Sequence, residues 1–151
     1  MKKFVLSLAV SAVLVGVVVP AQAQEGEESN PAIVHRHGIY TIVGGHMKAI
    51  KSILLLGFDA PKDVTFHAQG IADAFSHMGN SYPPGSDKGE TKAKPEIWTQ
   101  GEKVKQLGGN AFAAANDLAK VSQGGDKQAS LVAFKKLGET CKACHDEFKK
   151  K

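Results

Sequence analysis

The strongest chemical pattern in the sequence lies near its C-terminal end, where two residues separate Cys141 from Cys144 and His145 follows directly. On a helix, cysteines three residues apart lie about one turn apart and face the same side. Two such thiols can form thioethers with the two vinyl groups of one porphyrin, and the adjacent imidazole can ligate its iron. The pattern therefore predicts one covalent haem c, attached to Cys141 and Cys144, with His145 as the iron ligand.

Three other interpretations of the cysteine pair stay open at this point: a redox dithiol, half of a zinc site and a strained disulfide. A thioredoxin-like dithiol belongs to a βαβ unit, and the sequence has no β-alternation of useful length. Tetrahedral zinc would need further ligands at a matching spacing, but the chain has only two cysteines and both lie in this pattern. Haem attachment is therefore favoured.

Four apolar stripes with helical spacing make up most of the chain, each bounded by helix-breaking residues. The expected helices run from Asn30-Pro31 to Gly57, from Ala60-Pro61 to Gly79-Asn80, from Pro95 to Gly124-Gly125, and from the N-cap Asp126 onward. Residues 81–94 contain Pro83-Pro84-Gly85 and are expected to form a loop. Three-four spacing in four segments predicts an all-α fold, an antiparallel up-down-up-down left-handed four-helix bundle.

The first 23 residues differ in composition from the rest of the chain. Lys2 and Lys3 precede an apolar run, and Ala21-Gln22-Ala23 has the small-x-small pattern of a signal peptidase site. We therefore expect residues 1–23 to be a cleaved signal peptide and residues 24–151 to form one exported domain without stable membrane insertion. A permanent anchor is the alternative, but the apolar run is shorter than the ~20 residues that a spanning helix needs.

The net charge of the chain bears on whether it binds nucleic acid. The formal net charge is +4, and two of the positive charges belong to the predicted signal peptide. So weak a positive bias does not indicate binding to nucleic acid.

Three segments of the sequence carry a resemblance to a known family. They are the motif from Cys141 to His145, the Lys94-Pro95-Glu96-Ile97-Trp98 entry to the third helix, and the segment from Arg36 to Lys51. Together they resemble cytochrome c′, the high-spin branch of the class II c-type cytochromes, over residues 30–151. The resemblance implies a periplasmic mono-haem protein with the bundle fold that this family is known for.

The resemblance also implies roles for two residues of the first helix. It places Arg36 against a haem propionate, and an arginine on a core-facing stripe does need an anion. It places Tyr40 over the vacant distal side of the iron, where low-spin relatives carry a methionine ligand. Because an unperturbed phenol titrates near ~10, it would have to lose its proton before it could ligate iron. A five-coordinate, high-spin iron is therefore expected.

Further contacts are implied at the edge of the haem. The residues concerned are His37, Thr91, Lys92 and Lys94. Met47 lies two turns beyond Tyr40, and we interpret it and Met78 as core residues. Lys149 stands where relatives commonly have an arginine near the proximal histidine, and lysine lacks the planar guanidinium fork.

These inferences predict a gas-binding protein rather than an enzyme. The ligands would be nitric oxide and carbon monoxide, with nitric oxide scavenging as one role. An electron-transfer cytochrome that serves periplasmic redox partners is the alternative. A peroxidase-like activity is disfavoured, because the first helix offers no distal histidine paired with an arginine or carboxylate. The resemblance also suggests a homodimer through the first two helices, with surplus apolar residues at Ile53, Leu55, Leu56 and Phe58.

Overall fold

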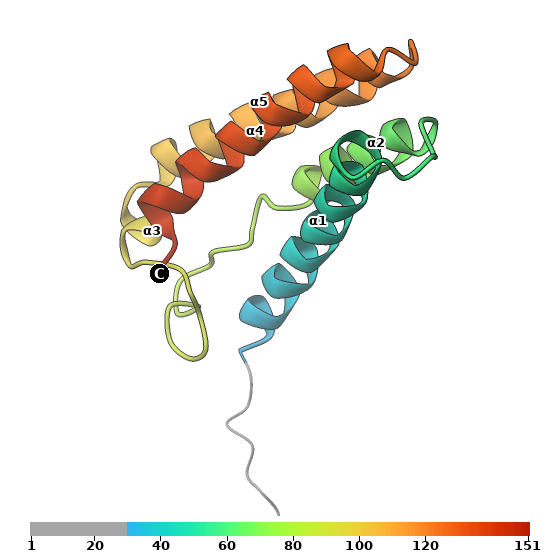
Figure 1. Cartoon of the computed structure of the whole chain (residues 1–151). Helices are drawn as coiled ribbons and strands as arrows, with labels where there is room; N and C mark the ends of the chain where they lie inside the picture. The colour runs from blue at the N-terminus through green and yellow to red at the C-terminus, as the bar shows by residue number, and fades with distance from the viewer. Residues whose placement is uncertain (1–29) are drawn as a thin grey trace, which may run out of the picture.

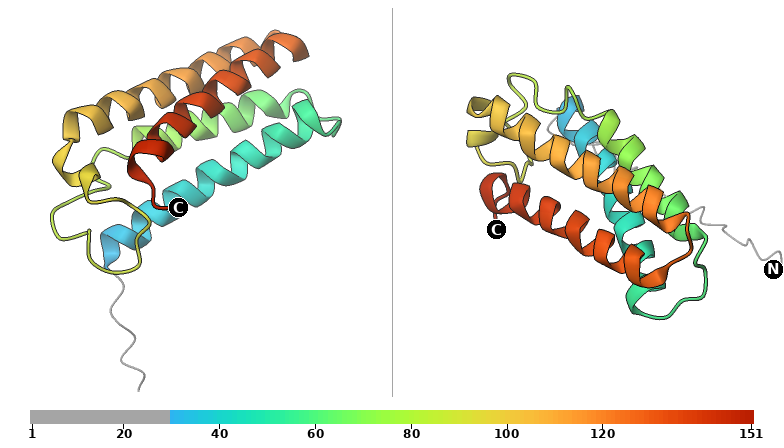
Figure 2. Two further views of the ribbon diagram at one scale, coloured as in Figure 1. Left: turned by 60° about the vertical axis from the view of Figure 1, so that its left-hand side comes forward. Right: turned by 90° about the horizontal axis from the view of Figure 1, so that it is seen from above.

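The computed structural model describes residues 30–151, so the predicted signal peptide, residues 1–23, lies outside the described residues. Within residues 30–151, five helices follow one another: α1 (Pro31–Leu55), α2 (Asp63–Ser76), α3 (Glu96–Thr99), α4 (Gly101–Ser122) and α5 (Lys127–Phe148). The four long helices lie side by side and alternate in direction, with the start of α1 and the C-terminus at one end (Figures 1 and 2). The predicted all-α, antiparallel four-helix bundle is confirmed.

Local sequence explains where α1 begins and ends. The side chain of Asn30 accepts a hydrogen bond from Ala32 N at 3.0 Å, and Pro31 occupies the first turn, where its missing N–H costs nothing. After Leu56, Gly57 adopts φ +83°, a conformation that glycine takes without strain. Both ends agree with the prediction.

The third predicted helix is divided into two in the structure. Gln100 (φ −111°, ψ 47°) leaves the helical region and separates the single turn of α3 from α4. The separate turn buries Ile97 and lets Trp98 Nε1 donate a hydrogen bond to Pro83 O at 3.2 Å. The break therefore gives the loop of residues 77–95 an anchor that a continuous helix would not provide.

The last helix begins and ends at residues that fix its position. Asp126 is the N-cap, as expected, because its carboxylate accepts hydrogen bonds from Gln128 N and Ala129 N at 2.8 and 3.0 Å. At the other end, Lys149 forms an isolated antiparallel bridge with Ala93 of the loop. The loop and the end of α5 are thus joined through backbone hydrogen bonds.

The core runs along the middle of the bundle. Its fully buried large apolar side chains come from all four long helices: Ile50, Ile71, Leu118 and Leu137. Consecutive helices pack closely (α1 on α2, α2 on α4, α4 on α5), whereas α1 and α5 touch much less. The α1–α5 seam is therefore the least closely packed contact between neighbouring long helices of the bundle.

Two expectations about individual side chains have different outcomes. Met47 packs against the core, as expected. Ile53 was expected among the surplus apolar residues, but it is only 5 % exposed and belongs to the core. It directly precedes Leu54, which is also buried, and both side chains pack in the core of the bundle. Leu55, Leu56 and Phe58 are exposed.

Candidate haem-binding site

The two cysteines lie on α5, one turn apart, and both are half-buried free thiols. Burial raises the pKa of both thiols. Cysteines that serve redox chemistry have lowered pKa values, because the thiolate is the reactive form. The environment of the pair therefore does not favour a redox dithiol, whereas thiols kept protonated and facing the bundle fit attachment of an apolar macrocycle.

His145 follows the second cysteine on an exposed part of the last turn of α5. Desolvation, and after it the positive charge of Lys149, lower the pKa of His145. The imidazole therefore stays neutral at neutral pH, and the neutral ring is the form that ligates a metal. In this chain the cation at position 149 acts on His145 through its charge.

A pair of tyrosines lies across from the cysteine motif. Tyr40 of α1 and Tyr82 of the loop share a hydrogen bond of 2.9 Å between their hydroxyl groups. Burial raises the pKa of Tyr40 far above its usual value, and it raises the pKa of Tyr82 as well. Negative charge on Cys144 would raise both pKa values further, which places the motif close to the pair. Both phenols are therefore neutral at physiological pH.

Arg36 lies one turn before Tyr40 and is only 2 % exposed. Its guanidinium donates four hydrogen bonds to the loop. The acceptors are Ser81 O (3.3 Å), Ser86 Oγ (2.9 Å), Ser86 O (2.7 Å) and Thr91 Oγ1 (2.8 Å). Burial lowers the pKa of Arg36, although an arginine remains charged in a protein. Because these four acceptors are neutral, the hydrogen bonds satisfy the group without compensating its charge, and an anion at this place would be stabilised.

Aromatic rings enclose the same guanidinium. Its carbon lies 5.1 Å from the ring centroid of Tyr82 and 5.5 Å from that of Trp98, within the range of cation–π attraction. The two rings also pack edge to face, with centroids 5.7 Å apart. The arginine therefore holds the loop in place and positions Tyr82 against Tyr40.

The predicted loop residues are placed at the end of α5. Lys94 Nζ donates to Asp146 O and Glu147 O at 3.0 and 2.9 Å, which puts a cation on the orphan carbonyls of the helix C-terminus. Lys150 N donates to Lys92 O at 2.7 Å. The structure thus brings Arg36, Tyr40, Thr91 and Lys94 to the end of the bundle that holds the motif. The side chains of His37 and Lys92 are exposed.

Two residues of this site were not predicted from the sequence. Tyr82 lies in a segment expected to be an ordinary loop, and Ser81 precedes it. Ser81 Oγ is buried and takes no hydrogen-bond partner among the described residues, beside the carbonyl that Arg36 contacts. A buried hydroxyl and a charge-uncompensated arginine suit a carboxylate, so the donor set fits the propionate side of a haem.

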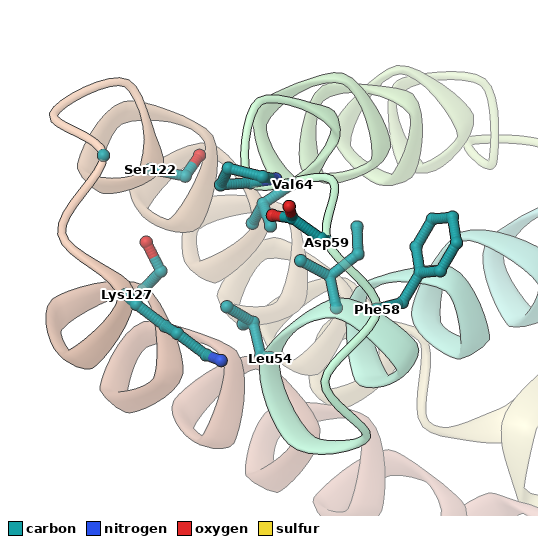
Figure 3. Close-up of a pocket in the computed structure, with 10 residues that line it drawn as sticks. Leu54, Phe58, Asp59, Val64, Ser122 and Lys127 are labelled. Carbon is teal, nitrogen blue, oxygen red and sulfur yellow. The ribbon is translucent and has the colours of Figure 1, made fainter.

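A separate small cavity lies at the opposite end of the bundle. Its volume is about 80 Å³, and Figure 3 shows Leu54, Phe58, Asp59, Val64, Ser122 and Lys127 around it. The lining comes from the α1–α2 and α4–α5 connections and includes none of the predicted haem residues.

Comparison with known proteins agrees with this site. The family model described as cytochrome c′ matches residues 31–149. The chain belongs to the cytochrome c′ family. Members of this family bind haem c, and both cysteines of the attachment motif are present in the chain. Among the described residues, no helix is both long and apolar enough to cross a membrane.

Individual relatives cover most of the chain. The cytochrome c′ of Rhodocyclus tenuis is 35% identical over 136 residues, which span 84% of this chain and 99% of the relative. That of Allochromatium vinosum is 32% identical over 155 residues, spanning all of both chains. A solved cytochrome c′ with a ligand-controlled dimer dissociation is 34% identical, with a TM-score of 0.76, covering 80% of this chain and 95% of that one. The resemblance inferred from the sequence is confirmed.

Proposed function

We propose that this protein is a periplasmic cytochrome c′ whose haem iron is five-coordinate and high-spin and binds nitric oxide and carbon monoxide. Cys141 and Cys144 would hold the haem through thioethers, and His145 would ligate the iron. When bound, the haem supplies a ferrous iron that can coordinate a diatomic gas. The observation that carries the proposal is the state of Tyr40, a neutral phenol already hydrogen-bonded to Tyr82.

The side of the site formed by α1 offers no strong sixth ligand in this arrangement. A phenolate ligand is costly, because the pKa of Tyr40 is raised by its burial. Met47 packs into the core two turns further along α1, about 10 Å from Tyr40 at 1.5 Å per residue. A side chain that competes weakly for the iron leaves the position open to a small neutral gas.

Arg36 would bind a haem propionate, and Ser81 lies next to this arginine. Arg36 carries a charge that its four neutral acceptors do not compensate, so a propionate there gains more than it would at an exposed lysine. Thr91 orders the same guanidinium, and Lys94 holds the loop to α5. Contacts of His37 and Lys92 with a propionate stay predictions.

Solved structures of the same fold support a gas ligand. A cytochrome c′ variant from Alcaligenes xylosoxidans, 22% identical with a TM-score of 0.72, has been solved as its nitric oxide complex. At this level of identity the comparison supports the fold, which is able to hold the gas. A role in nitric oxide scavenging follows if this chain binds the gas tightly.

Titration of the reduced mature protein with carbon monoxide and nitric oxide tests the proposal. We expect saturable uptake of one gas molecule per haem, followed in the optical spectrum. The matched control is Tyr40→Met, which offers the iron a sixth ligand and should bind carbon monoxide much more weakly. An electron-transfer cytochrome with a closed site would take up no carbon monoxide in either form, and that result would refute the proposal.

A homodimer is the second part of the proposal. The solved cytochrome c′ named above dissociates from a dimer under the control of ligand. In this chain, apolar side chains are exposed along α1 and α2 and the turn between them. They are Val34, Ile42, Leu55, Leu56, Phe58 and Phe66. Burial of this surface against a second copy would stabilise a dimer.

A further inference from the structure

Two histidines meet at the seam between α1 and α2, away from the proposed haem site. His46 Nδ1 and His67 Nδ1 lie 2.9 Å apart, and the two rings are tilted by 55°. Such a contact requires one ring to carry its proton on Nδ1 and the other to present a lone pair there. Desolvation and the nearby His67 lower the pKa of His46, so at least this ring stays neutral at neutral pH. Neutral imidazoles are the form that binds metal ions.

The seam has a shape that holds the two rings together. A Cβ at Gly70 would lie 2.5 Å from His46 Nε2 and 2.7 Å from its Cε1, so the His46 ring can occupy this place only because residue 70 is glycine. Phe66 packs edge-on against both rings, with centroids 6.0 and 5.1 Å away. Both histidines remain partly exposed to solvent. The pair is therefore ordered and reachable.

We propose that His46 and His67 form a two-nitrogen binding site for a divalent transition-metal ion, with Cu²⁺ preferred, separate from the haem iron. Two nitrogens 2.9 Å apart, each ~2.05 Å from a shared ion, subtend an angle of ~90° at that ion. This is the angle between neighbouring ligands in the tetragonal geometry of Cu²⁺ and Ni²⁺. Tetrahedral Zn²⁺ would need the nitrogens ~3.4 Å apart, so the rings would have to separate.

Binding of the metal ion requires only a change of tautomer and a small movement of the two rings. The ring that donates through Nδ1 shifts its proton to Nε2, and the rings tilt slightly so that both Nδ1 lone pairs converge on the ion while the two Nδ1 atoms stay close to their present separation of 2.9 Å. No proton is lost overall when both rings are neutral. Among the described residues, no third His, Cys, Asp or Glu joins the pair, so solvent would supply the other ligands. The site is therefore expected to bind an exchangeable ion.

The test is a titration of the ferric holoprotein with Cu²⁺, followed by calorimetry and by electron paramagnetic resonance of the copper. The ferric form is used so that the haem cannot reduce the ion. We expect one Cu²⁺ per chain, with hyperfine structure from two nitrogens, and weaker binding of Zn²⁺ in line with the Irving–Williams order. His46→Gln and His67→Gln should each weaken Cu²⁺ binding by more than about tenfold, since even the loss of an outer-shell partner costs 10–100-fold.

A second variant tests the geometry with both histidines kept. Gly70→Ala should swing the His46 ring off the seam and weaken Cu²⁺ binding as strongly as His46→Gln does. The matched controls are Gly44→Ala, where a Cβ meets no atom within 4 Å, and His35→Gln, an exposed histidine of α1. Both controls should bind Cu²⁺ as the parent protein does. If the His46→Gln His67→Gln double variant still binds one Cu²⁺ per chain with unchanged affinity, the pair is only a structural hydrogen bond and the proposal is wrong.

Discussion

At the scale of single residues, the site depends on how a few polar groups are satisfied. The helical positions of the cysteine motif, Arg36 and Tyr40 could be predicted from the sequence, because a short spacing and one helical stripe encode them, whereas the contacts of Arg36 and Tyr40 with a haem stay predictions from the family resemblance. Tyr82 could not, because its hydroxyl reaches Tyr40 only through the fold of a long loop. The sequence therefore predicts the positions of site residues on helices but does not predict Tyr82, the loop residue that is hydrogen-bonded to Tyr40.

The first prediction concerns the hydrogen bond between the hydroxyl groups of Tyr40 and Tyr82. Tyr82→Phe removes the partner of the Tyr40 hydroxyl and should lower the free energy of unfolding by about 1 kcal/mol. Urea unfolding of the mature holoprotein measures this effect. Because the two hydroxyls act on each other, the Tyr40→Phe Tyr82→Phe double variant should lose less than the sum of the two single variants. Additive losses would show that the pair contributes nothing.

The second prediction concerns the guanidinium group of Arg36. Arg36→Lys keeps the charge but cannot make four hydrogen bonds in the plane of a guanidinium, so it should lower the free energy of unfolding by at least about 2 kcal/mol. Urea unfolding checks this too, with His35→Gln, a change at an exposed residue next to Arg36 in the chain, as the control. An Arg36→Lys protein as stable as the parent would mean that charge alone holds the loop.

At the scale of elements, the four long helices were predictable because apolar periodicity and capping residues are local signals. Asn30 and Asp126 lie at the predicted starts, and each accepts the expected backbone hydrogen bonds. The break at Gln100 was not predicted. The break goes with tertiary contacts, because the separate turn buries Ile97 and places the Trp98 indole where it donates a hydrogen bond to Pro83 O of the loop.

The contact between α1 and α2 predicts a pH dependence. The folded protein holds His46 with a lowered pKa, so the unfolded chain takes up a proton first as the pH falls below the ordinary value of 6.5. The stability that the neutral ring contributes is present above pH 6.5 and is lost as the pH falls toward the folded pKa. Urea unfolding at pH 8 and at pH 5.5 should show this loss.

His46→Gln provides the control for that measurement. Other groups of the protein also titrate in acid, so the parent protein can lose stability for more than one reason. The difference between the parent and the variant isolates the contribution of His46. We expect the variant to lose less stability on acidification. An equal loss in both proteins would contradict the assignment.

At the scale of the whole molecule, the exposed apolar side chains of α1 and α2 predict assembly. Ile42 is 53 % exposed on α1, so Ile42→Arg should convert a dimer to a monomer in sedimentation velocity experiments. The matched control is Val132→Arg on α5, which is 60 % exposed and lies outside the proposed interface. A parent protein that is monomeric at high concentration would contradict the proposed dimer.

The central claim is that the iron is ligated on one side only, with Tyr40 as a neutral neighbour on the other. Electron paramagnetic resonance of the ferric mature protein, compared with Tyr40→Met, tests it most directly. We predict a high-spin signal for the parent and a low-spin, six-coordinate signal for Tyr40→Met, because the proposed site places position 40 over the iron, where a thioether would be a sixth ligand. A low-spin parent protein, or a Tyr40→Met protein whose signal stays high-spin, would contradict the account.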